Sequence, residues 1–289
     1  MDTEPEHPPD EEVKLFWPLD HHYSPVPDTR KLAKRRFKLR VWPEEPHPTP
    51  GIDWRGEEQL ALCRDVFGAQ QPLDFPTEPP ADGEYWQGNG WYPALDAFVL
   101  QAMLRHVAPA RVIEVGCGFS SRVTARVNRE IFGGEMRFTC IDPVIRTPIQ
   151  QEVEGITEIR QEEVQDTPLE LFEELDAGDI LFIDTSHAVK TGGDVPWIYN
   201  QILPRMKPGV VVHLHDAFLP GDYPEEWVME GRAWNEVYLL QSFLTFNSGF
   251  EVVFGVRWMM QNHRAALEEA FGDLGPHSDL SGALWIRRV

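Results

Sequence analysis

The sequence predicts an α/β protein in which a mostly parallel sheet carries helices on both faces. From Ala110 onward, short apolar stretches of strand length alternate with stretches of helical periodicity. A turn with two glycines follows the first of these apolar stretches, and two further strand-like stretches close the chain. Such alternation is typical of parallel sheets whose helical connections cover both faces.

Seven strands and their connecting helices follow from this pattern. Strands are expected at 111–115, 136–141, 157–160, 179–183, 209–214, 250–256 and 282–287. Helices are expected at 120–130, 147–153, 168–175, 193–204, 234–245 and 263–271, with a loop over 217–228. Five alternating units are thus followed by a pair of strands with a different connection.

The residues before this alternation form two predicted segments. Residues 1–50 hold ten of the 25 prolines, which favours a Pro-rich and partly disordered extension. Residues 51–109 are expected to form a helical cap region, with helices at 52–67 and 94–106. The remaining residues, 110–289, are expected to form the ligand-binding domain.

Charge and composition exclude several classes of protein. The net charge of −21 argues against a nucleic-acid partner, because phosphate binding relies on clustered Lys and Arg. Residues 30–40 oppose the trend with seven Lys and Arg, which pair with the acidic body or bind an anionic substrate or lipid surface. No apolar run suits a membrane span and no signal pattern opens the chain, so a cytoplasmic protein is expected.

The turn after the first strand carries the first functional signal. Gly116 and Gly118 let the backbone approach a ligand, and the turn has no Lys, unlike a phosphate cradle. The segment resembles the first motif of class I S-adenosylmethionine (SAM) methyltransferases, E/D-x-G-x-G. A nicotinamide or flavin site and a turn without ligand are the alternatives. The resemblance implies that the cofactor contacts Glu114, Gly116, Cys117, Gly118 and Ser120.

The ends of the next two strands extend this predicted site. Ligands of open parallel sheets bind outside the carboxyl ends of the strands. Asp142 ends the second strand and can accept hydrogen bonds from both hydroxyls of a ribose. In SAM enzymes the adenine lies against the turn after the third strand, which implies contacts with Val164 and with Glu162 or Glu163, of which we select Glu163.

Four polar residues follow the fourth and fifth strands and are expected to converge. They are Asp184, His187, His215 and Asp216. The set could hold a divalent cation, Mg²⁺ or a transition metal, on Asp184, His215 and Asp216. Alternatively, His187 or, second, His215 acts as general base while Asp184 orients the acceptor. A hydrogen-bonded structural cluster is the third interpretation.

The stretch from Phe182 to Asp216 resembles a bacterial group of class I methyltransferases with the motifs F-I-D-x-x-H and H-D. The likeness extends over about residues 85 to 289. It implies a Rossmann-like seven-stranded methyltransferase sheet whose last strand is antiparallel, with SAM as cofactor. Some related O-methyltransferases depend on Mg²⁺, but His215 stands where such relatives often carry a carboxylate.

The sequence therefore predicts a SAM-dependent methyltransferase that acts on an oxygen of a small-molecule acceptor, such as a natural product or a sugar. Three alternatives stay open. They are a metal-dependent hydrolase or hydroxylase-like enzyme on the same fold, an NAD-dependent oxidoreductase, and a SAM-binding protein without catalysis. The missing third glycine of the turn and the final strand pair argue against the oxidoreductase.

Overall fold

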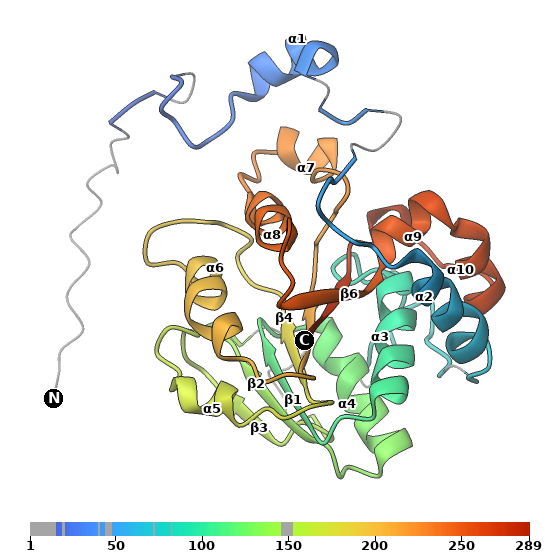
Figure 1. The fold of residues 1–289 in the computed structure, drawn as a ribbon. Helices are drawn as coiled ribbons and strands as arrows, with labels where there is room; N and C mark the ends of the chain where they lie inside the picture. Colours follow the sequence, from blue (N-terminus) through green and yellow to red (C-terminus); the bar gives the residue numbers. More distant parts are fainter. Residues whose placement is uncertain are drawn as a thin grey trace, which may run out of the picture.

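A computed structural model describes residues 16–18, 21–39, 41–43, 48–71, 73–81, 83–145 and 153–289. One sheet forms the centre of the molecule, with helices on its two faces (Figure 1). Residues 147–152 of the helix predicted at 147–153 lie outside the described residues, and so does part of the predicted extension over 1–50.

The sheet has seven strands in the order β3-β2-β1-β4-β5-β7-β6. The strands are β1 (Arg111–Val115), β2 (Arg137–Ile141), β3 (Glu158–Arg160), β4 (Ile180–Ile183), β5 (Val211–Leu214), β6 (Phe250–Gly255) and β7 (Leu284–Arg288). Strands β1 to β5 are parallel, and β7 runs antiparallel between β5 and β6. The chain leaves β1 toward β2 and β3 and then returns to β4, so the strand order reverses between β1 and β4.

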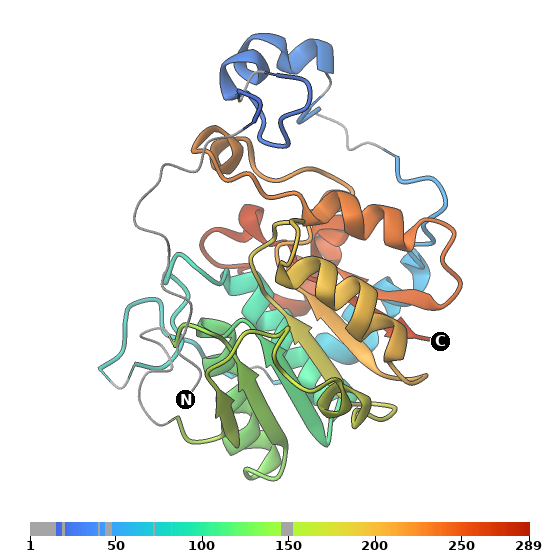
Figure 2. The same ribbon diagram turned by 90° about the vertical axis from the view of Figure 1, so that its left-hand side faces the viewer.

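Helices form a layer on each face of this sheet (Figures 1 and 2). One layer holds α2 (Gly56–Ala61) with its π-helical continuation Leu62–Phe67, α3 (Ala94–Val107), α4 (Phe119–Phe132), α9 (Val256–Asn262) and α10 (Arg264–Phe271). The other holds α5 (Leu169–Glu173), α6 (Asp194–Trp197), which continues to Arg205 in π- and 3₁₀-helical turns, and α8 (Glu236–Leu244). Helices α1 (Thr29–Leu39) and α7 (Glu225–Met229) lie beyond the carboxyl ends of the parallel strands.

Alternation along the strands divides the core into two clusters. Val112 of β1 and Phe182 of β4 belong to the cluster under α3 and α4. Ile113 and Leu181, their neighbours in the sequence, belong to the cluster under α6 and α8. Because successive side chains of a strand point to opposite faces, strands buried on both faces are largely apolar, with Glu114 of β1 and His213 of β5 as buried exceptions.

The predicted fold class is confirmed, including all seven strands and the antiparallel final pair. Three of the described α-helices were not predicted: α1 in the basic segment, α7 in the expected loop and α9 directly after β6. Pro224 directly precedes α7, which occupies the end of the loop predicted over 217–228 and one residue beyond it. Helix α9 was missed because it begins with the β-prone residues Val256 and Trp258, directly after a strand.

None of the described helices is both long and apolar enough to cross a bilayer.

Candidate functional site

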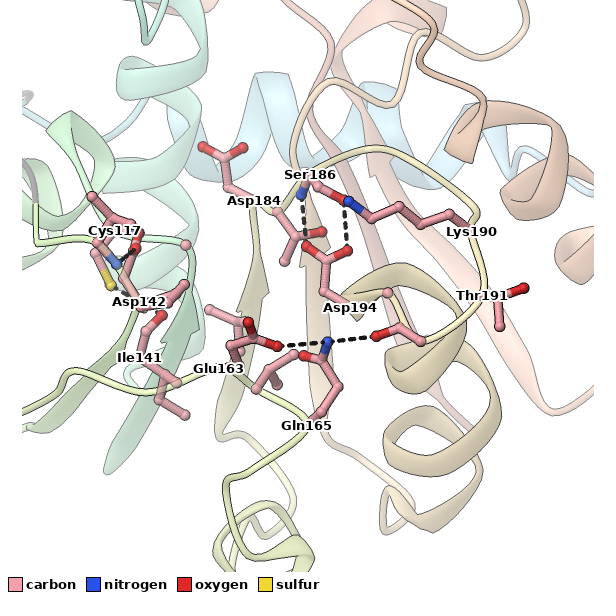
Figure 3. A pocket seen from close by; sticks show the side chains of 18 residues that line it. Cys117, Ile141, Asp142, Glu163, Gln165, Asp184, Ser186, Lys190, Thr191 and Asp194 are labelled. Carbon is pink, nitrogen blue, oxygen red and sulfur yellow. Dashed lines mark hydrogen bonds between the residues drawn. The ribbon is translucent and has the colours of Figure 1, made fainter. Parts of the chain in front are cut away.

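A pocket of about 480 Å³ opens at the carboxyl ends of β1, β2, β3 and β4, where the strand order reverses. Open α/β sheets bind their ligands at such a switch point. Figure 3 shows side chains around this hollow, with Asp142 on one side and Lys190 and Thr191 on the other. Among the predicted site residues, the pocket is lined by Gly116, Cys117, Asp142, Glu163, Val164 and Asp184.

Gly116 lets the turn after β1 pass close to the end of β4. Its φ of +83° lies in the left-handed region, and a Cβ there would stand 1.5 Å from the carbonyl oxygen of Asp184. Only glycine avoids that overlap. The Asp184 backbone N–H in turn donates to the Val115 carbonyl at 2.8 Å, which joins the two strand ends.

Asp142 lies in the pocket wall directly after β2. Its Oδ2 accepts a hydrogen bond of 2.9 Å from the Cys117 backbone N–H, and its Oδ1 accepts one of 2.8 Å from Val144 N–H. The side chain is therefore held at the β1 turn, as Figure 3 shows for Cys117. Each carboxylate oxygen has a second lone pair with which it can accept a bond from a ligand hydroxyl.

Two polar contacts hold the loop that borders the pocket after β4. The Gln165 side chain donates a hydrogen bond of 2.9 Å to the Gly192 carbonyl. Ser186 donates two bonds to Asp194, from its backbone N–H at 2.8 Å and from its hydroxyl at 2.6 Å (Figure 3). The turn after β3 and the loop after β4 are thus joined to each other at the border of the pocket.

Three residues of the predicted cofactor set lie outside the pocket lining. Glu114 is completely buried, and the Ser120 hydroxyl donates a hydrogen bond to its Oε1. Gly118 has an extended φ of −175° and begins α4, where its N–H donates to the Ser121 hydroxyl at 3.0 Å. Their contact with a cofactor stays a prediction, whereas the Ser120–Glu114 and Gly118–Ser121 hydrogen bonds hold the turn in place.

The four residues expected to converge do lie together, in a group that we call the histidine cluster: Asp184, His187, His215 and Asp216. His187 Nε2 lies 3.3 Å from Asp184 Oδ1 and 3.6 Å from Asp216 Oδ2. His215 Nδ1 lies 3.5 Å from Asp184 Oδ1 and 3.6 Å from Asp216 Oδ1. Asp184 alone of these residues also lines the pocket, and its side chain is 29% exposed.

Two carboxylates missed by the sequence reasoning stand behind the histidines. Glu236 of α8 places Oε2 3.0 Å from His187 Nδ1, and Asp96 of α3 places Oδ2 3.7 Å from His215 Nε2. Both side chains are buried. Each lies in the first turn of its helix, where an acid is expected to face water near the helix dipole. The apolar residues around Asp96 in the sequence were the signal that could have indicated its burial.

Comparison with known proteins assigns this architecture to a family. Residues 113–217 match a family model described as "Methyltransferase domain". A protein of Archaeoglobus fulgidus without a described function is 31% identical over 175 residues, which cover 58% of this chain and 77% of that protein. The chain is therefore related to this archaeal protein, and its residues 113–217 form a methyltransferase domain.

A solved structure also resembles the methyltransferase. It is a DUF574 family protein from Streptomyces avermitilis, 15% identical, with a TM-score of 0.39 over 68% of this chain and 80% of that one. The family match ends at Ala217 and begins at Ile113, so it contains the pocket and the histidine cluster but neither Asp96 nor Glu236.

Charge in the histidine cluster is set by mutual pairing. Burial disfavours the charged form of His187, but hydrogen bonds to Asp184 and Glu236 outweigh it and raise the pKa of the ring to about 10. Burial likewise opposes charge on His215, yet Asp216 and Asp184 raise its pKa well above the usual value. Burial would raise the pKa of Asp184, but the two imidazoles hold it well below its usual range.

The predicted metal finds no support in this arrangement. No group of three or more His, Cys, Asp or Glu side chains in the described part of the methyltransferase is arranged to hold a metal ion. Both nitrogens of His187 face carboxylates, which favours an imidazolium without a lone pair for a cation. His215 Nδ1, His215 Nε2 and Asp216 Oδ1 are buried without a hydrogen-bond partner among the described residues. His215 Nδ1 lies 3.5 Å from Asp184 and 3.6 Å from Asp216, so a metal on these three residues stays a prediction.

Proposed function

We propose that this methyltransferase uses SAM to methylate an oxygen of a small-molecule acceptor. The observation that carries the proposal is the pocket across the ends of β1 to β4, in which the tight Gly116 turn and the Asp142 carboxylate lie side by side. A glycine turn admits a nucleoside close to the backbone, and a carboxylate at the end of the second strand suits ribose hydroxyls. The family match supports methyl transfer as the chemistry.

Each part of the pocket then receives a binding role. We assign Asp142 to the ribose and the turn with Glu163 and Val164 to the adenine. When bound, SAM supplies a methyl group on a sulfonium, which an acceptor oxygen displaces. The acidic lining, with Asp142, Glu163 and Asp184, suits that positive charge. The acceptor is assigned to the Asp184 end of the pocket, where the histidine cluster begins.

Asp184 is our choice for the group that faces the acceptor hydroxyl. The oxygen becomes strongly acidic as its new bond to carbon forms, so an ionised carboxylate is basic enough to take its proton late in the displacement. His187 and His215 hold that carboxylate ionised and oriented. His187 as the base, the expectation from the sequence, requires that the ring first lose the proton stabilised by Asp184 and Glu236.

Calorimetry with S-adenosylhomocysteine and with NAD⁺ tests the cofactor. We expect the former to bind and the latter not to bind. Asp142→Ala should weaken S-adenosylhomocysteine about 100-fold, because two hydrogen bonds to a charged group are worth about 3 kcal/mol or more. Asp166→Ala, an exposed acid in the turn after β3, is the matched control and should leave the affinity unchanged.

Methyl transfer itself is measured with SAM labelled on its methyl group and a low-molecular-weight extract of the source cells. We expect label in an acceptor through a bond that resists alkali, as an ether does. Preferential binding of NAD⁺, or equal affinity of Asp142→Ala and the native protein for S-adenosylhomocysteine, would contradict the proposal. Binding without transfer to any extract component would favour the non-catalytic alternative.

A further inference from the structure

The first turn of α8 is bonded to the loop that carries His187. The backbone N–H groups of Asn235 and Glu236 both donate to the His187 carbonyl, at 2.9 and 3.1 Å. The Asn235 side chain accepts a bond of 2.6 Å from Val189 N–H. His187 itself has a φ of +55°, a left-handed conformation that non-glycine residues seldom adopt and that needs support from its surroundings.

The side chains repeat this link between the two segments. Glu236 Oε2 lies 3.0 Å from His187 Nδ1, and both side chains are at least 90% buried. The opposite nitrogen of the ring, Nε2, lies 3.3 Å from Asp184 Oδ1. Two side-chain contacts therefore link Glu236 through His187 to Asp184, whose carboxylate lines the pocket.

We propose that Glu236 is a positioning residue for methyl transfer, which it serves by holding His187 against Asp184. The inference rests on the proposed function, because it gives Asp184 the acceptor side of the site. Glu236 itself does not line the pocket. It lies outside the matched domain, so α8 adds a residue to a site whose pocket and histidine cluster lie within residues 113–217.

Burial of the Glu236–His187–Asp184 contacts explains why the loss of one of them can affect the orientation of Asp184. A buried imidazole pointed at Asp184 by one partner has few other orientations that satisfy both of its nitrogens. The Trp234 ring, whose centroid lies 4.7 Å from that of His187, covers a further side of the imidazole. Loss of the Glu236 carboxylate frees the ring to turn, and Asp184 then loses its fixed hydrogen-bond donor.

Replacement of Glu236 tests the inference in the full-length protein. Glu236→Ala should lower labelled methyl transfer at saturating SAM about 10- to 100-fold, since a small misplacement at a reacting centre costs about that much. The KM for SAM and the affinity for S-adenosylhomocysteine should change less than about threefold. Glu236→Gln, whose amide oxygen can still accept from Nδ1, should recover part of the rate.

A double-variant cycle separates positioning from general damage to the fold. In a His187→Asn background, Glu236→Ala should cause no further loss of rate, because the two residues act through one contact. Asp179→Asn changes a buried acid at the opposite end of the sheet, where Asp179 accepts bonds from the Arg111 and Asp176 backbones. That control should lower thermal stability and leave the rate intact.

The imidazole NMR signals give a readout that needs no acceptor. The native protein should show an exchange-protected proton on His187 Nδ1, and Glu236→Ala should lose it. An unchanged Nδ1 proton in Glu236→Ala, additive losses in the cycle, or an equal loss of rate in Asp179→Asn would each overturn the inference. Failure of the native protein to bind S-adenosylhomocysteine would refute the proposed function instead, while the NMR signal would still report on the Glu236 contact.

Discussion

Two acids at the ends of neighbouring strands, Glu114 of β1 and Asp184 after β4, have opposite surroundings. Glu114 is completely buried with hydroxyl partners and no cation, and burial raises its pKa to about 8. Asp184 is one-third exposed at the pocket, and His215 and His187 hold its pKa low in spite of burial. The same functional group is thus kept protonated at one strand end and ionised at the next.

The difference in protonation suggests separate roles for the two acids, with Glu114 as a structural support and Asp184 as a group that faces the ligands. A protonated Glu114 can donate a hydrogen bond as well as accept one, which suits a buried group that supports the turn after β1. An ionised Asp184 at the pocket can attract a positive charge or accept a proton. Environments that drive the pKa values of paired acids apart commonly mark their separate roles. Three substitutions test whether the two strand ends differ in this way.

The largest loss of stability from a single substitution is expected at Gly116, where the ends of β1 and β4 are in contact. Gly116→Ala places a Cβ on the Asp184 carbonyl and in a left-handed conformation at once. Neither strain can relax without moving a strand end, so the free energy of unfolding should fall by about 3 kcal/mol or more. Urea denaturation measures it, or the yield of folded protein if the loss is complete.

Gly118→Ala is the matched control two residues along. Its φ is extended, and a Cβ there would meet no atom within 4 Å. Stability should stay within about 0.5 kcal/mol of the native value. If SAM approaches Gly118 as the sequence predicts, the control should weaken S-adenosylhomocysteine without loss of stability. Equal stability of the two variants would show that β1 and β4 do not meet as described.

Neutralisation of Asp184 should have the next largest effect. Asp184→Asn removes the charge that faces the pocket, and we expect methyl transfer to fall about 100-fold, as for loss of a general base. S-adenosylhomocysteine binding should change only severalfold, because Asp142 and the β1 turn remain. Asp279→Asn, on an exposed side chain, serves as control. A rate within twofold of the native rate would remove Asp184 from the chemistry.

Sequence reasoning predicted the pocket half of the site from local patterns. The β1 turn and Asp142 each follow a short apolar strand, and the carboxyl ends of parallel strands meet at one edge of a sheet. The convergence of Asp184 with His215 followed from the expected adjacency of β4 and β5, which the register of these strands confirms. These inferences needed only the order of the strands.

The partners of the histidines could not be found in this way. Asp96 and Glu236 lie on α3 and α8, and no rule of strand order says which turn of a helix meets the sheet edge. His213 shows that strand alternation also fails to tell a site residue from a core residue. It shares a face with His215 but lies between Phe182 and Trp285, where burial lowers its pKa, so it is a neutral core residue.

The last substitution tests the protonated state of Glu114 through the pH dependence of stability. Its pKa is about 8 in the folded protein and about 4.5 in the unfolded chain, so between these values the folded state holds the extra proton. The free energy of unfolding of the native protein should therefore fall as pH rises through this window, by at most about 1.4 kcal/mol per pH unit from this group. Glu114→Gln cannot titrate and should lack that slope.

Urea denaturation of both proteins from pH 5 to pH 8.5 gives the comparison. Glu114→Gln should gain stability relative to the native protein as pH rises, because the native protein must either keep a proton or bury a charge. Glu170→Gln, on the exposed side of α5, should run parallel to the native protein. A constant difference between Glu114→Gln and the native protein would mean that Glu114 is ionised in the fold. The two strand ends would then carry like charges, and only the histidines would distinguish Asp184 from Glu114.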